Sequence, residues 1–162
     1  MPQTPVNGLS LPLSHMRDLL AATSAFQDWT GAADADEAKA HIYLVNLPQS
    51  DLQRPFALVG FSDKWKREKI AQYQYQTTGE LYLTFEADVA IADQESESDA
   101  VFGFMNPLGA VIDEITAIAG TDNYLNVIEM EMPSLPMRTN SEDTEMDEDY
   151  YAAEFMIVWS GI

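Results

Sequence analysis

The residues with the clearest chemical potential are the carboxylates of "DTEMDEDYYAAE", residues 143–154. Counted from Asp143, oxygen-bearing side chains stand at loop positions 1, 3, 5 and 12, where an EF-hand binds calcium. Position 6 is Glu148, although that loop needs a glycine for its sharp turn. The flanks are also wrong for two helices, because prolines precede the stretch and "FMIVW" follows it. The pattern therefore favours a mobile acidic loop over residues 136–149. A weak, adventitious cation site within it would use Asp143, Glu145, Asp147 and Asp149.

Catalytic and cofactor motifs are weaker still. The chain contains no cysteine, and His15 and His41 are its only histidines, too far apart for a metal-binding pair. Asp113 and Glu114 are neighbours on a predicted helix, so their side chains point about 100° apart and cannot share a proton. The glycines do not form a phosphate-binding loop. We therefore expect no catalysis, no cofactor and no dedicated metal centre.

Charge separates the chain into two unequal halves. The net charge is −19, with 11 acids against 7 bases in residues 1–89 and 16 acids against Arg138 alone in residues 90–162. Such a balance opposes tight binding to nucleic acid or to an anionic membrane. The local net charge is positive in the stretch "DKWKREKI". Its bases, together with two acids of the loop, are the interface candidates: Lys64, Lys66, Arg67, Lys69, Glu142 and Asp143. The alternative interpretation is a solvated strand edge that lysines keep soluble.

Length and composition indicate one intracellular domain. A chain of 162 residues can bury one core of ordinary size, and we expect a single domain over residues 1–162. No apolar run approaches the roughly 20 residues of a membrane helix, and the first residues do not follow the pattern of a signal peptide. We therefore expect no contact with a membrane.

The first half of the chain is predicted to supply a helix and then strands. Residues 1–12 read as an extended N-terminal arm, and Ser14 could cap a helix that Gly31 ends. "DADEAKA" predicts a short helical turn. "HIYLVNLP", "RPFALVGF" and "KIAQYQYQTTG" predict strands.

The second half of the chain is predicted to supply a strand, a long helix and two further strands. "GELYLTFEADVAI" alternates apolar and polar residues, which is typical of a strand with one buried face. A second helix is expected from Ser98 to Gly120, kinked or restarted at Pro107. "NYLNVIEMEMP" and "YYAAEFMIVW" predict the last strands. The fold class is therefore α+β, a mainly antiparallel sheet with two main helices packed on one face.

The order of these segments resembles that of tail-terminator (tail-completion) proteins of tailed phages and prophages. The resemblance extends over nearly the whole chain and is carried by "AFQDWTG", "AKAHIYL", "RPFALVGF", "GELYLTFEADV", "GFMNPLGAVIDEITAIAG" and "YYAAEFMIVWSG". The acidic insertion and the proline within the second helix depart from it, so no site residue carries over. The resemblance implies a structural protein without catalysis, whose copies form a ring, commonly a hexamer, on the tail tube. Its partners would be itself, the tail tube protein and the head–tail connector protein, in a virion or in the bacterial cytoplasm.

Two other functions remain open on the residues alone. The charge would suit an acidic decoy that mimics DNA, although most of the excess charge lies in two predicted loops. A small-ligand-binding domain would use the aromatic residues of the predicted strands: Trp65, Tyr73, Tyr75, Tyr82 and Trp159. Such residues more often form core or cross-strand pairs.

Overall fold

The computed structural model describes residues 10–44, 53–88, 97–118, 126–132, 137–139 and 150–161. The helices are α1 (Leu11–Ala22), α2 (Ser24–Thr30), α3 (Ala35–Lys39) and α4 (Glu97–Ile118). The strands are β1 (Ile42–Tyr43), β2 (Phe56–Ala71), β3 (Gln74–Asp88), β4 (Asn126–Glu131), β5 (Met137–Thr139) and β6 (Tyr150–Gly161). The predicted α+β fold is confirmed.

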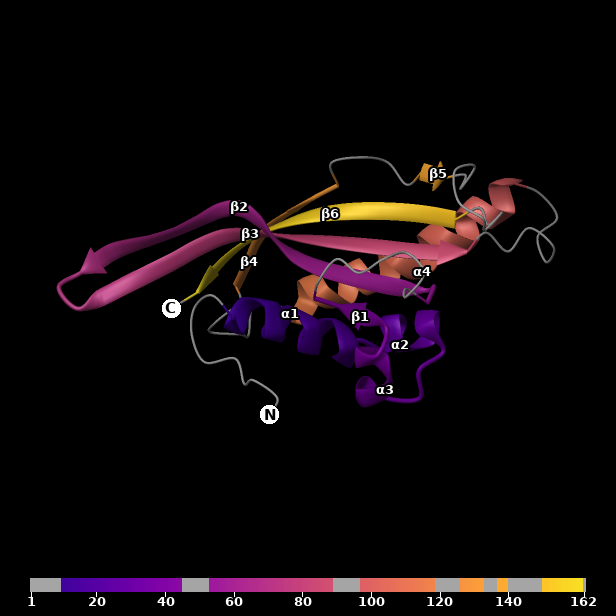
Figure 1. Ribbon diagram of the computed structural model, residues 1–162, viewed down its shortest axis with the longest axis horizontal. Helices are drawn as coiled ribbons and strands as arrows, with labels where there is room; N and C mark the ends of the chain where they lie inside the picture. The colour runs from indigo at the N-terminus through magenta and orange to yellow at the C-terminus, as the bar shows by residue number, and fades with distance from the viewer. Residues whose placement is uncertain are drawn as a thin grey trace.

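The six strands form one sheet in the order β1-β2-β3-β6-β4 (Figure 1). β1 is parallel to β2 and the other pairs are antiparallel, so the sheet is mixed but mainly antiparallel. β5 pairs with the first residues of β6, beyond the part that pairs with β4. The last strand in the chain is thus an interior strand of the sheet.

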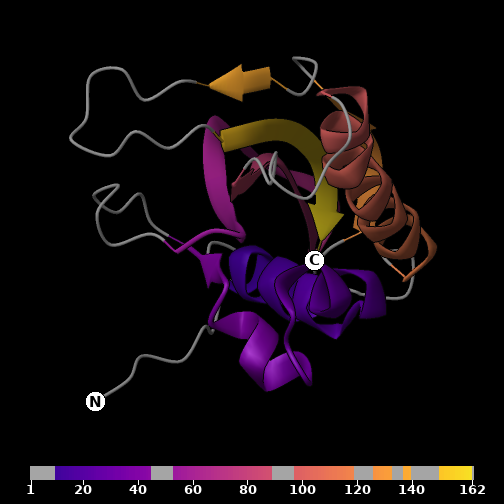
Figure 2. The same cartoon turned by 90° about the vertical axis from the view of Figure 1, so that its right-hand side faces the viewer.

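The core lies between one face of the curved sheet and the helices. In β3 and β6 every second residue is buried, as the alternation predicts: Leu81, Leu83 and Phe85 in β3, and Tyr151, Ala153, Phe155, Ile157 and Trp159 in β6. Residues two apart on a strand share a face, so all of these side chains point to the same side. Figure 2 shows α1 to α3 and α4 closing that side of the sheet. The rings of Phe26, Trp29 and Phe155 surround that of Phe85, with centroids 5.7 to 6.4 Å away.

The first predicted helix is two helices, because Thr23 interrupts it. Thr23 has extended backbone angles, and its hydroxyl accepts a hydrogen bond from the Phe26 amide and donates one to the Leu20 carbonyl. These bonds make it the N-cap of α2. α1 also begins at Leu11, so Ser14 is not its cap. Gly31 ends α2 as predicted, with φ of 74°.

The second long helix differs from the prediction at its start and at its proline. α4 begins at Glu97 and continues through Pro107, so Ser98 is not its cap and the helix does not restart at the proline. Buried residues stand on both sides of it, Phe104 and Leu108 being 4% and 3% exposed. Burying two large side chains offsets a proline cost of about 3 kcal/mol.

Two predicted boundaries among the strands are wrong. The turn between β2 and β3 falls at residues 72–73, inside the stretch "KIAQYQYQTTG" that predicted one strand. Residues 137–139 form β5 within the predicted loop 136–149. The rest of that loop, including all the proposed cation ligands, lies outside the described residues, and so do residues 1–9 of the predicted N-terminal arm.

Candidate assembly surfaces

The basic residues singled out in the sequence lie on a hairpin that projects from the body. We call residues 64–78, at the joined ends of β2 and β3, the hairpin arm. Figure 1 shows it extending past the helices at the left end of the long axis. β6 pairs with β3 only as far as Thr77, so the outer part of the arm has two strands. At about 3.3 Å per residue, residues 65–71 extend roughly 20 Å.

The hairpin arm carries a net charge of +3, from four basic residues and Glu68, in a chain of −19. Lys64, Lys66, Arg67 and Lys69 are all exposed. The ammonium of Lys64 lies 3.1 Å from Glu80, and Lys66 pairs with Glu68. The guanidinium of Arg67 lies 5.4 Å from the centroid of Tyr75, a cation–π contact. The arm therefore has the opposite charge to the chain as a whole.

One face of the hairpin arm continues the core face of the sheet beyond the helices. Trp65, Arg67 and Lys69 pair with Gly79, Thr77 and Tyr75 across the two strands, and directly paired residues share a face. Trp65 and Tyr75 are 41% and 45% exposed there, and Tyr73 at the turn is 87% exposed. This face combines exposed aromatic side chains with Arg67, and aromatic residues and arginine are enriched in protein interfaces.

The base of the hairpin arm is closely packed. The buried indole of Trp159 lies against Gly79, so that a Cβ on this glycine would come within 3.0 Å of ring atoms Cζ2 and Nε1. The same Cβ would lie 3.1 Å from the Lys64 carbonyl oxygen. Glycine at this position therefore allows the indole to pack between the arm and the body.

A second surface is the outer face of the sheet, opposite the core. Six acidic residues lie on it by register: Glu80, Glu86, Asp88, Glu129, Glu131 and Glu154. Glu129, for example, lies opposite Val158 of β6, which lies opposite Glu80 of β3. Lys64 pairs with one end of this surface. Arg54 pairs with the other through Glu86 at 3.4 Å and Asp88 at 3.2 Å. The surface is acidic overall.

Burial changes the titration of one acid on this surface. Desolvation raises the pKa of Glu86 above its usual value, and the charge and hydrogen bond of Arg54 oppose that rise. Arg54 also lies 4.0 Å from the centroid of the Tyr150 ring. The cluster links the segment before β2 to β3 and β6, and we interpret it as structural.

A third surface is the side of α4 that faces away from the sheet. Residues at helical spacing are buried on the inner side: Ala100, Phe104, Leu108, Val111 and Ile115. On the outer side, Phe102 is 56% and Met105 38% exposed, and Asn106, Gly109 and Asp113 are exposed as well. We call the residues from Phe102 to Asp113 on this side the outer face of α4.

By length and composition, residues Asp99–Ile118 could cross a membrane. This differs from the expectation that no segment is long and apolar enough, because alanine, valine, leucine, isoleucine, phenylalanine and methionine make up most of the stretch and it contains no basic residue. Core helices pass the same test, and the inner side of α4 packs in the hydrophobic core. The apolar composition of α4 is thus partly explained by its place in the fold.

Glu114, which the sequence analysis considered only as the helical neighbour of Asp113, contacts another helix. Its carboxylate accepts hydrogen bonds from the Ser24 amide and hydroxyl, both at 2.8 Å, and from the Ala25 amide at 3.1 Å. These donors lie in the first turn of α2, where a negative charge is stabilised. The hydrogen bond from the Ser24 hydroxyl contributes most to lowering the pKa of Glu114, and those from the two amides add to it. The contact fixes α4 against α2, and nothing in the local sequence indicates it.

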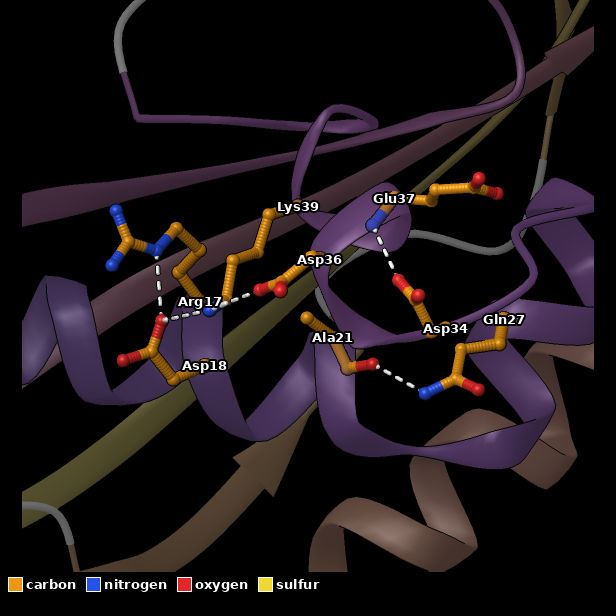
Figure 3. A network of polar contacts seen from close by, with 8 residues as sticks. All are labelled: Arg17, Asp18, Ala21, Gln27, Asp34, Asp36, Glu37 and Lys39. Atoms are coloured by element: carbon orange, nitrogen blue, oxygen red, sulfur yellow. Dashed lines mark hydrogen bonds and ion pairs between the residues drawn. The ribbon is translucent and has the colours of Figure 1, made fainter.

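The remaining polar contacts on the helices are structural (Figure 3). Asp18 of α1 lies 2.9 Å from Arg17 and 4.0 Å from Lys39, which joins α1 to α3. Asp34 caps α3 by accepting a hydrogen bond from the Glu37 amide. Both histidines lie in the described part, where Nδ1 of His41 is 3.0 Å from the Pro55 carbonyl oxygen. Within the described ranges, no group of three or more His, Asp or Glu residues is placed to hold a metal ion.

The structure therefore places four of the six interface candidates on one exposed hairpin. Glu142 and Asp143, the acidic candidates, lie outside the described residues, so their predicted pairing with the basic ones stays a prediction. The sequence reasoning did not identify the outer face of α4 as a surface. Phe102 and Met105 could have indicated it, because they fall outside the stripe formed by Phe104, Leu108 and Val111.

Comparisons with known proteins identify no family. The sequence matches no family model and no curated protein. Among solved structures, it is similar to a chain from the virion of a native gene transfer agent particle. That similarity covers 88% of this chain and 90% of the other at 12% sequence identity, with a TM-score of 0.42. A similarity at this level assigns neither a shared fold nor a function.

Proposed function

We propose that this protein is a structural component of a phage-type tail, a tail-terminator or tail-completion protein whose copies join into a ring on the tail tube. It would catalyse no reaction and would also bind the tail tube protein and the head–tail connector protein. The order of segments along the sequence, described above, suggests this class of protein. The observation that carries the proposal is the hairpin arm, an exposed cationic and aromatic projection on a strongly acidic chain.

The hairpin arm has the side chains of a surface that binds another protein. Exposed aromatic side chains at three positions, Trp65, Tyr73 and Tyr75, are costly to leave in water and stabilise contacts when they are buried against a partner. The positive charge favours an acidic partner, and another copy of this chain is one. An arm that binds a different surface on the next copy makes a heterologous contact. Such contacts close into a ring when the rotation permits.

The outer face of the sheet supports a role as a conduit. Its six acids outnumber the two bases that pair with them, so this surface would repel a DNA backbone. A ring with this surface toward its channel would let DNA pass without holding it. A binding role for nucleic acid would instead need lysines and arginines there.

Self-association tests this proposal directly. We expect the mass in solution to rise with protein concentration to that of a closed ring, a hexamer by the resemblance. High salt should weaken assembly because it screens the arm's charges. The arm variant Arg67→Glu/Lys69→Glu should lose assembly while keeping its unfolding midpoint. The control, Arg17→Glu/Lys39→Glu, changes the charge equally on α1 and α3. It removes the ion pairs with Asp18, so its unfolding midpoint should fall, but below that midpoint it should assemble. A chain that stays monomeric at all concentrations and salt conditions contradicts the proposal.

One observation favours a second candidate function, the acidic decoy. The carboxylates of Glu80, Glu129 and Glu131 lie in neighbouring rows of one sheet face, as a DNA mimic requires. This candidate predicts that the isolated chain inhibits a DNA-binding enzyme and that Glu129→Gln/Glu131→Gln relieves the inhibition. The ring proposal predicts no inhibition and unchanged assembly for that variant.

A further inference from the structure

The exposed apolar residues gather mainly at two places. Of the nine large exposed apolar residues in the described part, five lie on or next to the hairpin arm: Phe61, Trp65, Ile70, Tyr73 and Tyr75. Three lie on α4: Phe102, Met105 and Ile118. Because a monomer leaves both groups in water, each is a candidate for burial against a partner.

The two surfaces cannot meet within one chain. Figure 1 shows the hairpin arm at the left end of the long axis and the N-terminal half of α4 toward the right end. A contact between them would therefore need a second copy. Each copy would offer one arm and one outer face of α4, which is the arrangement that produces a head-to-tail ring.

The charge and the length of the hairpin arm are compatible with those of the outer face of α4. Residues 98–118 contain no basic residue, and Asp113 is exposed on the outer face of α4. The aromatic face of the arm carries Arg67 and Lys69. From Phe102 to Asp113 the helix rises roughly 17 Å at 1.5 Å per residue, comparable with the roughly 20 Å of the arm. The exposed backbone of Gly109 lies midway, where nothing lies within 4 Å of a Cβ position.

We propose that the hairpin arm of one copy binds the outer face of α4 of the next copy. Tyr73 and Tyr75, toward the tip of the arm, would cover Phe102 and Met105, and Arg67 and Lys69 would approach Asp113. This inference rests on the proposed ring and names the surfaces that form it. The arm would bind a helix surface of the body, in place of the acidic loop expected from the sequence.

Two complementary variants test which surfaces meet. The arm variant Arg67→Glu/Lys69→Glu and the α4 variant Asn106→Lys/Asp113→Lys should each raise the concentration needed for assembly by about tenfold or more, because like charges would face each other. An equimolar mixture should assemble again, since each arm then finds an α4 surface of opposite charge. Such a ring would alternate the two variants. All four substituted side chains are exposed, so both variants should keep the wild-type unfolding midpoint.

The control mixture pairs the arm variant with Asp28→Lys/Asp36→Lys, which adds positive charge at exposed positions of α2 and α3. This mixture should assemble no more than the control variant does alone. A separate measurement uses the absence of cysteine from the chain. The double variant Tyr73→Cys/Asn106→Cys should form intermolecular disulfides under oxidation, up to a closed covalent ring. Tyr73→Cys/Asp36→Cys should not do so beyond random collisions.

The outcomes separate the two proposals. If the wild-type chain assembles but the mixture does not recover and the Tyr73–Asn106 cysteines do not cross-link, the docking surface is wrong and the ring stands. Normal assembly of the α4 variant alone would also overturn the docking surface. If the wild-type chain never self-associates, the proposed function fails, and this inference fails with it.

Discussion

Replacing Gly79 by alanine should destabilise the protein, because the new methyl group would meet atoms that cannot move away. The Cβ would lie 3.0 Å from two ring atoms of Trp159, whereas carbon atoms in contact prefer about 3.5–4.0 Å. The indole is 1% exposed, and the third close atom is the Lys64 carbonyl oxygen of the paired strand. To relieve these contacts, the buried ring or the backbone of β2 would have to shift.

The magnitude follows from two opposing effects. Overpacking of a filled site costs about 1–3 kcal/mol. Alanine also reduces the conformational freedom of the unfolded chain, which stabilises the folded state by about 0.4–1 kcal/mol. We expect a net loss of about 1–2 kcal/mol in the free energy of unfolding, which lowers the melting temperature by about 2–8 °C for a domain of this size.

Urea unfolding at low protein concentration, followed by tryptophan fluorescence, gives the measurement. Gly60→Ala is the matched control, since this glycine lies in the paired strand β2 and has nothing within 4 Å of its Cβ position. The control should unfold at the wild-type midpoint or slightly above it. If the Gly79 variant is as stable as the Gly60 variant, the close packing described at the base of the hairpin arm is wrong.

Three further changes have expected outcomes. Hydrogen bonds lower the pKa of Glu114 in the folded protein. The stability that Glu114 contributes is therefore present above the ordinary carboxyl pKa and is lost as the pH falls through the folded pKa. Urea midpoints measured against pH should show less loss of stability in acid for Glu114→Gln than for the wild type. Burial raises the pKa of Glu86 in the folded protein. The contribution of Glu86 to stability therefore increases as the pH falls through its folded pKa, which is the reverse of Glu114. Glu86→Gln should lack this increase in urea midpoints measured against pH. Phe85→Ala should cost about 3–5 kcal/mol in chemical denaturation, because the ring is fully buried among three others, and a loss below about 1 kcal/mol would contradict that packing.

The sequence predicted the strands of the core well because alternation reports burial directly. Leu81, Leu83 and Phe85 alternate with polar residues, and only one face of an antiparallel sheet needs to be apolar. Gly31 was equally clear, since a glycine after an apolar helix is the usual C-terminal signal. These features depend on neighbours in the chain.

The errors arose where distant contacts override local signals. The turn at residues 72–73 has no glycine, proline, asparagine or aspartate, so nothing marks it and its strands are fixed by pairing instead. Pro107 is a strong helix breaker, but burial of Phe104 and Leu108 keeps the helix continuous.

The candidate surfaces were only partly predictable for the same reason. The basic cluster was visible because charge is a property of the residues themselves. The sequence did not show that these basic residues project on a two-stranded hairpin, because that projection depends on where β6 stops pairing with β3. Glu114 and its partner Ser24 are 90 residues apart, and no local pattern relates them.

The position of β6 between β3 and β4 constrains the order in which the sheet can form. Synthesis proceeds from the N-terminus, so β3 and β4 emerge from the ribosome before the strand that must separate them. Until residues 150–161 are available, the β2–β3 hairpin can pair while β3 lacks its second neighbour and the core lacks the buried side chains of β6. The contacts that complete the sheet span long stretches of chain, which slows folding. The body of this fold is therefore complete only once residues 150–161 have joined the sheet.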